Sequence, residues 1–424
     1  MNPITQQITE VELKDGTRIF IAPTGAKNIV TIEGSVRGGW SMLARSKAEA
    51  ALIAAELLDS GTSTKSKDGI HEALGKRGAS LSFKDGADRT FFSGSCFPED
   101  LLFLLSLISE CLADAIIPAP DVISAKTRAL GDLEESATDT RTQAAGALSR
   151  LLYDKTHVNY METTKNRIQN LTAIARADVV SFRKSLSREG LVVAIVGDLE
   201  TSKARTAAEK AFKTLPKGVG ISLEERIHQG TYIVSETLVP INDKANIDTY
   251  FGTTIPFTYD SPEYLPFVTL SSMLGGRGLS SGHLMRTIRE RDGYTYGIYA
   301  QQVGFLEKTQ GAFRIWATFS PATFTEAVAA TKKEITVFLK KGMTEDALSL
   351  KKDEMIGNYL IGLSTTRGLA GMLHTIGVEG KPLSYIDAYP SLIRAITLSE
   401  VQNLSPLLAP ENLSLAASGT FPKQ

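Results

Sequence analysis

The chain has 424 residues, with 46 lysine and arginine side chains against 47 aspartate and glutamate, and a formal charge of −1. This balance argues against a general affinity for nucleic acid, because phosphate binding needs an excess of basic residues. Hydrophobic residues make up 42% of the chain, and at about 100 to 200 residues per domain the length predicts two to four domains with sizeable cores.

The sequence predicts no transmembrane span. Its longest apolar run, 101–108, falls far short of the roughly 20 apolar residues that a span needs. The polar first residues lack the basic-then-apolar pattern of a signal peptide. We therefore expect a cytoplasmic protein, or a periplasmic one if a signal peptide was removed before Met1.

Two cysteines, Cys96 and Cys111, exclude a disulfide framework and a four-thiolate zinc site.

The first half of the chain combines strand and helix patterns. Strands are predicted at 18–22 and 28–36, followed by a helix at 47–58 with Ser46 as its N-cap and Gly61 as its stop. The remaining elements predicted in this half are strands at 79–83 and 90–95, an apolar helix at 98–115, a long helical region at 120–154 and a buried strand at 191–196.

The second half repeats this order of elements. The predicted elements are strands at 231–235 and 247–254, a helix at 261–274, strands at 296–303 and 312–319, a helix at 321–341 and a further helix from about Thr344.

The repeat keeps a constant register near the end of each half. Residues 177–179 correspond to 399–401, and Gly197 corresponds to Gly419, with an offset of 222 in both cases (399−177, 419−197). We therefore predict an internal duplication. Its two homologous α/β domains would span 1–216 and 231–424, with a linker at 217–230.

The helix before Gly61 carries a carboxylate within an apolar segment. The run Leu-Ile-Ala-Ala-Glu places Glu56 four residues after Leu52, on the same helical face. In one interpretation Glu56 extends to solvent or pairs with a basic residue.

A second interpretation comes from a family that this segment resembles, the pitrilysin/insulinase zinc peptidases, which include processing peptidases and respiratory core subunits. Their catalytic helix carries His-x-x-Glu-His shortly before Gly-Thr, with two histidines as zinc ligands and the glutamate as general base. Counting back from Gly61-Thr62, those positions hold Leu52, Ala55 and Glu56. The distal glutamate ligand of the family falls near Glu134 or Glu135.

The resemblance implies an α+β fold. Its two homologous domains would each be a mostly antiparallel sheet packed with helices, arranged as a clam-shell. It also implies that this chain lacks a zinc site. Leu52 offers no ligand, Ala55 cannot accept a proton from water, and carboxylates without imidazole would make at best a weak site. We therefore expect no metal or cofactor in this chain.

A glycine-rich segment in the second half contains Gly275, Gly276 and Gly278. It fits neither a dinucleotide fingerprint nor a phosphate loop, so we expect a flexible loop. The residues that follow resemble the second-half signature of the family, in which an Arg and a Tyr seven residues apart contact the peptide substrate at the zinc site. Here they are Arg289 and Tyr296. In the alternative interpretation, Arg289 pairs with a surface carboxylate and Tyr296 is half-buried.

The combination predicts a non-catalytic subunit of a heterodimeric zinc endopeptidase. A homologous partner would hold the zinc, Arg289 and Tyr296 would act in trans, and the substrate would be an unfolded peptide or oligopeptide added to a sheet edge. A second hypothesis is an inert structural or interaction protein, like the respiratory core subunits. A third is an enzyme with other chemistry, although no Ser-His-Asp, Cys-His or phosphate-loop motif is recognisable.

Overall fold

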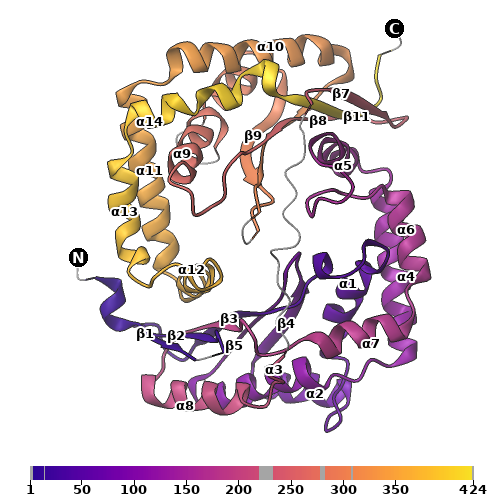
Figure 1. Ribbon diagram of the computed structural model, residues 1–424, viewed down its shortest axis with the longest axis vertical. Coiled ribbons are helices and arrows are strands. Elements are labelled where there is room, and N and C mark those ends of the chain that lie inside the picture. Colours follow the sequence, from indigo (N-terminus) through magenta and orange to yellow (C-terminus); the bar gives the residue numbers. More distant parts are fainter. Residues whose placement is uncertain (1–2, 14, 219–232, 277–281, 307–308, 423–424) are drawn as a thin grey trace. The chain divides into compact units, whose positions relative to one another are not determined.

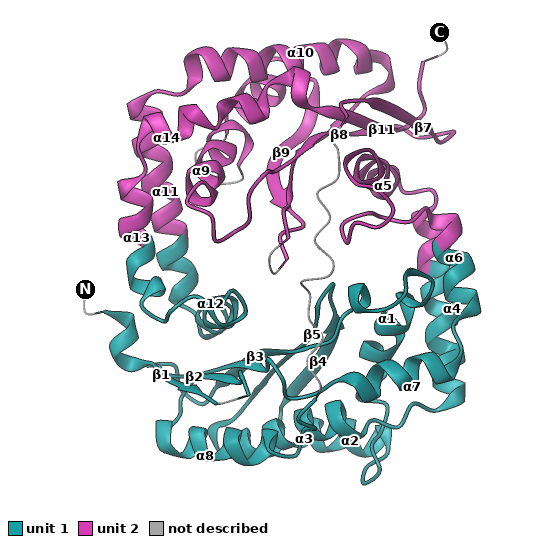
Figure 2. Ribbon diagram, viewed as in Figure 1, with its two compact units in different colours: residues 1–131, 167–221, 359–389 teal, residues 132–166, 222–358, 390–424 magenta. Residues whose placement is uncertain are grey.

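The computed structural model describes residues 3–13, 15–218, 233–276, 282–306 and 309–422 (Figure 1). Within these ranges, no helix combines the length and the apolar character needed to cross a membrane. The chain forms two compact units, which Figure 2 colours separately. Unit 1 contains residues 1–131, 167–221 and 359–389, and unit 2 contains residues 132–166, 222–358 and 390–424.

Unit 1 is built on a six-stranded mixed sheet. Its strand order is β1-β2-β6-β3-β5-β4, in which only β2 and β6 run parallel. The strands are β1 (Thr9–Glu12), β2 (Arg18–Pro23), β3 (Val30–Arg37), β4 (Ser80–Asp85), β5 (Arg89–Cys96) and β6 (Val192–Gly197). Its helices include α1 (Glu49–Glu56), α2 (Lys67–Gly75), α3 (Leu101–Asp114), α7 (Arg176–Ser185), α8 (Thr201–Phe212) and α12 (Thr366–Val378).

Unit 2 contains a five-stranded mixed sheet of order β7-β11-β8-β10-β9, in which only β7 and β11 run parallel. The strands are β7 (Glu236–Pro240), β8 (Ile247–Thr254), β9 (Thr295–Val303), β10 (Ala312–Phe319) and β11 (Ser414–Gly419). Its helices include α5 (Thr140–Leu152), α9 (Tyr264–Gly275), α10 (Phe324–Val337) and α14 (Leu398–Asn403). The helices α4 (Ala119–Ser136), α6 (Thr164–Ala173), α11 (Glu345–Leu363) and α13 (Tyr385–Ala395) have residues in both units.

The two sheets share one topology. The order β2-β6-β3-β5-β4 in unit 1 is matched by β7-β11-β8-β10-β9 in unit 2, including the single parallel pair. The starts of β6 and β11 are 222 residues apart (414−192), as are the starts of α7 and α14 (398−176). The structure therefore supports an α+β fold of two similar sheets packed with helices.

One helix in each unit comes from the other half of the sequence. Helix α12 of the C-terminal half lies on β6, β3 and β2 of unit 1, whereas α5 of the N-terminal half lies on β11, β8 and β7 of unit 2 (Figure 2). The compact units therefore interleave along the chain and do not follow the halves 1–216 and 231–424. The proposed common descent of those halves stays a prediction, and most of the linker 217–230 lies outside the described residues.

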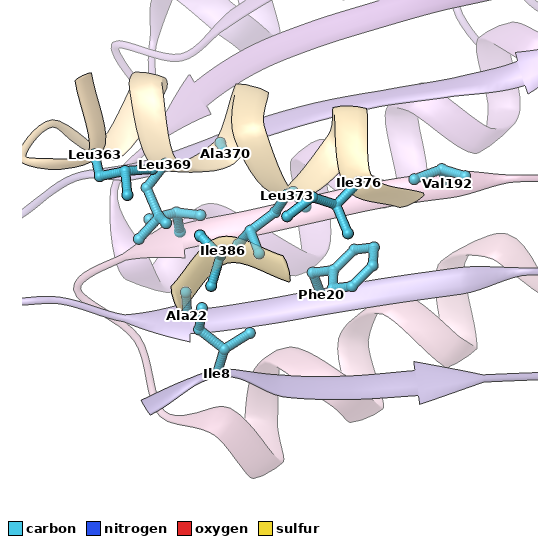
Figure 3. Close-up of a cluster of buried hydrophobic side chains, with 12 residues drawn as sticks. Ile8, Phe20, Ala22, Val192, Leu363, Leu369, Ala370, Leu373, Ile376 and Ile386 are labelled. Carbon is cyan, nitrogen blue, oxygen red and sulfur yellow. The ribbon is translucent and has the colours of Figure 1, made fainter. Parts of the chain in front are cut away.

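Helix α12 is held by an apolar stripe. Leu369, Leu373 and Ile376 recur at helical spacing and are buried against Phe20 of β2 and the apolar side chains of β6, as Figure 3 shows. Gly377 permits this close approach, because a Cβ there would lie 2.4 Å from Val192 Cγ1. The helix thus completes the hydrophobic core on this face of the unit 1 sheet.

Several predicted boundaries are corrected by the structure. The region 120–154 is not continuous, because α4 ends at Ser136 and the Asp139 side chain accepts a hydrogen bond from Thr142 N to begin α5. Ser46 does not cap α1, because it lies within a 3-10 turn and Ala48 takes the N-cap position. The strand predicted at 231–235 begins instead at Glu236, and residues 231–232 lie outside the described ranges.

Candidate functional site

Helix α1 carries the three positions that correspond to the family's zinc motif. Leu52 is half-buried, Ala55 is 3% exposed, and Glu56 is exposed at the last residue of the helix. A hydrocarbon and a methyl group present no lone pair to a cation and no base to a water molecule. Among the residues that the structure describes, no group of three or more His, Cys, Asp or Glu side chains is placed to hold a metal ion.

The Glu56 carboxylate is engaged by a basic residue. Nε of Arg128, on α4, donates to Glu56 Oε1 at 3.0 Å, and Nη2 of Arg128 donates to the same oxygen. The interpretation that Glu56 pairs with a basic residue is therefore confirmed. The positive charge beside this carboxylate is a guanidinium, so the donor set at these positions does not fit a catalytic zinc ion.

The other two carboxylates of the predicted motif lie further along α4. Glu134 and Glu135 are both exposed near the C-terminal end of this helix. They belong to the segment of α4 assigned to unit 2, whereas Glu56 belongs to unit 1. Their roles as degenerate ligand positions stay a prediction.

The loop after α1 is organised by a carboxylate that the sequence analysis missed. Glu110 of α3 accepts hydrogen bonds from the hydroxyls of Thr62 and Thr64 and pairs with Lys65 Nζ at 2.6 Å. Burial raises the pKa of Glu110, but these hydrogen bonds and the Lys65 charge outweigh it and hold the pKa below its ordinary value. Gly61, at φ +124°, supplies the backbone conformation that starts this turn. The Gly-Thr pair is thus anchored to α3.

The two described glycines of the glycine-rich segment, Gly275 and Gly276, are tightly packed. Gly275 is the last residue of α9, and a Cβ there would lie 2.8 Å from the Cβ of Ala300 on β9. A Cβ on Gly276 would lie 2.7 Å from the carbonyl oxygen of Ser272. Gly275 therefore permits close packing of α9 on β9, whereas the contact at Gly276 lies within the end of its own helix. The flexible loop expected from these glycines stays a prediction. Gly278 lies outside the described residues.

Arg289 and Tyr296 are brought together on the surface of unit 2. Arg289 lies on η6 (Met285–Arg291), a π-helical turn, and Tyr296 lies on β9. The Arg289 Cζ lies 5.4 Å from the centroid of the Tyr296 ring, and 86% of Tyr296 is exposed. The alternative of a half-buried Tyr296 is therefore wrong. Among the described residues, no carboxylate pairs with Arg289.

A buried carboxylate holds both ends of η6. Glu334 of α10 has a side chain that is 7% exposed. Its Oε2 lies 3.0 Å from His283 Nε2, just before η6, and its Oε1 accepts from Arg291 Nη2 at 3.0 Å at the end of η6. Burial lowers the pKa of His283, although the Glu334 contact opposes this shift. Wider i+5 hydrogen bonding, such as Asp292 N to Thr287 O at 2.9 Å, defines the π-helical turn.

Part of the chain matches a known family. Residues 173–355, which include Arg289, Tyr296 and Glu334, match a family described as the "Peptidase M16 inactive domain". The sequence of this segment is therefore similar to that of M16 inactive domains. The "Non-peptidase homolog YmxG" of Helicobacter pylori is 24% identical over 381 residues, which cover 87% of this chain and 83% of the relative. The "Probable inactive metalloprotease YmfF" of Bacillus subtilis is 20% identical over 46% of this chain and 44% of that relative.

Solved structures support the fold. A peptidase M16 inactive domain from Pseudomonas fluorescens matches with a TM-score of 0.87 at 20% identity, covering 98% of this chain and 99% of that one. A protease from Helicobacter pylori matches with a TM-score of 0.81 at 14% identity, covering 97% and 99% of the two chains. The chain is therefore similar to inactive M16 homologues in sequence and to M16 inactive domains in fold. The predicted resemblance to zinc peptidases without an intact motif is confirmed at this level.

Proposed function

We propose that this chain is the non-catalytic subunit of a heterodimeric zinc metalloendopeptidase. In this role, Arg289 and Tyr296 bind and polarise a peptide substrate at the zinc site of a homologous partner subunit. The clam-shell arrangement of the two halves and the zinc of the partner belong to the same proposal.

The observation that carries the proposal is the exposed contact between Arg289 and Tyr296. A guanidinium stays charged at all physiological pH values and presents several donors, and a phenol adds one more. Here both groups are exposed at one surface, with Cζ of Arg289 5.4 Å from the Tyr296 ring. Donors placed where negative charge develops on a carbonyl oxygen can each raise a rate by about 10²–10³.

The substrate in this proposal is an unfolded peptide or oligopeptide. Strand β4 forms one edge of the unit 1 sheet beside α1, and its side chains alternate between exposed and half-buried positions. An extended peptide can add to such an edge through backbone hydrogen bonds. This geometry supports peptide binding beside the degenerate motif.

The second candidate function is an inert structural or interaction protein. The similarity to a relative named a non-peptidase homolog favours it. A scaffold requires neither an exposed guanidinium at Arg289 nor an exposed phenol at Tyr296. The two functions therefore differ in what these side chains contribute.

Co-expression with an M16 homologue that keeps His-x-x-Glu-His tests the proposal. We expect the chains to co-purify, with zinc bound by the partner and less than stoichiometric zinc in this chain alone by atomic absorption. Arg289→Ala should lower turnover of an unfolded peptide by about 10²-fold, and Tyr296→Phe by about tenfold, without loss of assembly. Arg394→Ala, which removes another exposed guanidinium of unit 2, should leave turnover unchanged.

The outcomes separate the two functions. Stable assembly with unchanged turnover in both variants would contradict the trans role and favour the structural alternative. One zinc ion per isolated chain would contradict the absence of a site on α1.

A further inference from the structure

One face of the unit 2 sheet carries polar and aromatic side chains beyond the strands that α5 covers. Arg314 and Trp316 are two residues apart on β10 and therefore project from the same face. Their cross-strand neighbours on β9 are Gln301 and Tyr299. The rings of Tyr299 and Trp316 are nearly parallel, with an interplanar angle of 10° and centroids 5.7 Å apart.

Arg314 has only neutral partners on this face. With its amide oxygen turned toward the guanidinium, Gln301 accepts from Nη2 at 2.7 Å and from Nε at 2.8 Å. The guanidinium carbon lies 5.2 Å from the ring centroid of Tyr250 on β8. Among the described residues, no carboxylate pairs with Arg314. Its charge is thus held at a half-buried position without a counter-charge in contact.

A second guanidinium stands beside it. Arg141 of α5 is exposed, and its Cζ lies 4.0 Å from the centroid of the Trp316 ring. Burial lowers the pKa of Arg314, and the like charge of Arg141 lowers it further. The acidic side chain nearby, Asp248, is engaged by neutral donors, because its oxygens accept from Trp316 Nε1 at 2.6 Å and from the Thr140 hydroxyl at 2.5 Å.

A buried hydroxyl completes the group. Tyr153, which follows α5, is 9% exposed, and its hydroxyl makes no hydrogen bond with the described residues. The Asn159 amide lies near it, but Nδ2 of Asn159 donates to the carbonyl of Gly304 at 2.9 Å. Burial raises the pKa of Tyr153 to about 12, against the lowering effects of Asn159 and of the Arg314 charge. A buried hydroxyl donor without an acceptor is costly, so it favours an incoming acceptor.

We propose that Arg314 and Arg141 form a carboxylate-binding site on this sheet face, with the Tyr153 hydroxyl as a further donor. Its ligand is a peptide carboxylate, either an acidic side chain or a free C-terminus. A carboxylate accepts two hydrogen bonds from a guanidinium and supplies the missing negative charge. The aromatic rings of Trp316 and Tyr299 border the site and offer an apolar surface to the rest of the peptide. The proposal does not depend on the trans role of Arg289 and Tyr296.

Trp316 provides the reporter for a direct test with the full chain. The protein has two tryptophans, so Trp40→Phe leaves Trp316 as the single indole. The probes are acetyl-Gly-Glu-Gly-amide, acetyl-Gly-Gly-Gly with a free C-terminus, and the uncharged acetyl-Gly-Gln-Gly-amide. We expect at least one charged peptide to change the Trp316 fluorescence saturably in the millimolar range. The charged peptide that binds identifies the source of the carboxylate, and the uncharged peptide should have no effect.

Variants link the binding to the two guanidinium groups. Arg314→Gln should weaken binding about tenfold or more, because it removes a charge-assisted donor from a half-buried position. Arg141→Gln, at an exposed side chain, should weaken binding severalfold. Arg394→Gln is the matched control and should bind as the parent does.

The absence of saturable binding by both charged peptides would overturn the proposal, as would equal binding of the uncharged peptide or unchanged affinity in Arg141→Gln. Binding of inorganic phosphate without binding of either carboxylate would also overturn it.

Discussion

The Arg128 guanidinium on α4 donates from Nε to Oε1 of Glu56 on α1 at 3.0 Å. The side chains of this pair are 58% and 37% exposed, which places the pair in solvent of high dielectric. The Glu56 carboxylate, at a position predicted to correspond to a zinc ligand, is therefore satisfied by an ordinary surface ion pair. Helix α1 also carries Glu49, whose ion pair with Arg167 is much less exposed. Arg167 Nε donates to Glu49 Oε1 at 2.7 Å, and Arg167 Nη2 donates to Glu49 Oε2 at 3.2 Å.

We predict that Glu56→Ala changes the free energy of unfolding by less than about 1 kcal/mol, because exposed ion pairs contribute little. Glu49→Ala should cost about 2 kcal/mol or more, because the Glu49 side chain is 10% exposed and its loss leaves Arg167 without its bidentate partner. Urea unfolding of both variants measures the difference. A larger cost for Glu56→Ala would show that the Glu56–Arg128 pair has a structural role.

Helix α12 of the C-terminal half covers the unit 1 sheet, and α5 of the N-terminal half covers the unit 2 sheet. Because of this exchange of α5 and α12, we expect each half of the sequence to need the other in order to fold. We predict that a fragment of residues 1–216 lacks a cooperative unfolding transition and binds a hydrophobic dye, because without α12 the side chains of Phe20 and Val192 lose their cover. Co-expression with residues 231–424 should yield one soluble complex. Cooperative unfolding of the isolated 1–216 fragment, measured by circular dichroism, would contradict this dependence.

The sequence predicts most strands well because the signal is local. The runs at 191–196 and 312–319 are strands β6 and β10, since continuous or alternating apolar residues leave little choice of structure. The exchange of α5 and α12 could not be predicted in this way. An amphipathic helix pattern shows that one face is buried but does not identify the sheet that buries it.

The candidate site also contains residues that the sequence predicts and contacts that only the fold reveals. The positions of Leu52, Ala55, Arg289 and Tyr296 follow from motif spacing, whereas their surroundings come from the structure, which places Arg289 Cζ 5.4 Å from the centroid of the Tyr296 ring. The partners Arg128 and Glu334 were missed, because they lie 72 and at least 43 residues from the groups they bind. No local pattern marks a contact at such a separation, so only the fold reveals it.

His374 of α12 makes the stability of unit 1 depend on pH. Its Nε2 lies 2.8 Å from Ser35 Oγ, and burial, together with the Arg89 charge, lowers the pKa of His374 to about 3. Between that value and the ordinary pKa of about 6.5, the unfolded chain binds a proton that the folded chain does not. The contribution of His374 to stability is therefore complete above about pH 6.5 and decreases as the pH falls, by up to about 1.4 kcal/mol per unit.

His374→Gln should reduce this pH dependence. Urea unfolding at several pH values between 4 and 7 should give a shallower slope for His374→Gln than for the parent. Equal slopes in the two proteins would show that the acid sensitivity comes from other groups.

Glu334 should control the order of the turn that carries Arg289. The carboxylate contacts His283 before η6 and Arg291 at its end, so Glu334→Gln replaces the ion pair with Arg291 by a hydrogen bond to a neutral acceptor. We predict faster amide hydrogen exchange over residues 285–296 and a loss of about 1–3 kcal/mol in the free energy of unfolding. Glu326→Gln, a substitution at an exposed residue of the same helix, should change neither quantity. If exchange over 285–296 were unchanged in Glu334→Gln while global stability fell, Glu334 would stabilise the core of unit 2 without ordering the turn beside Tyr296.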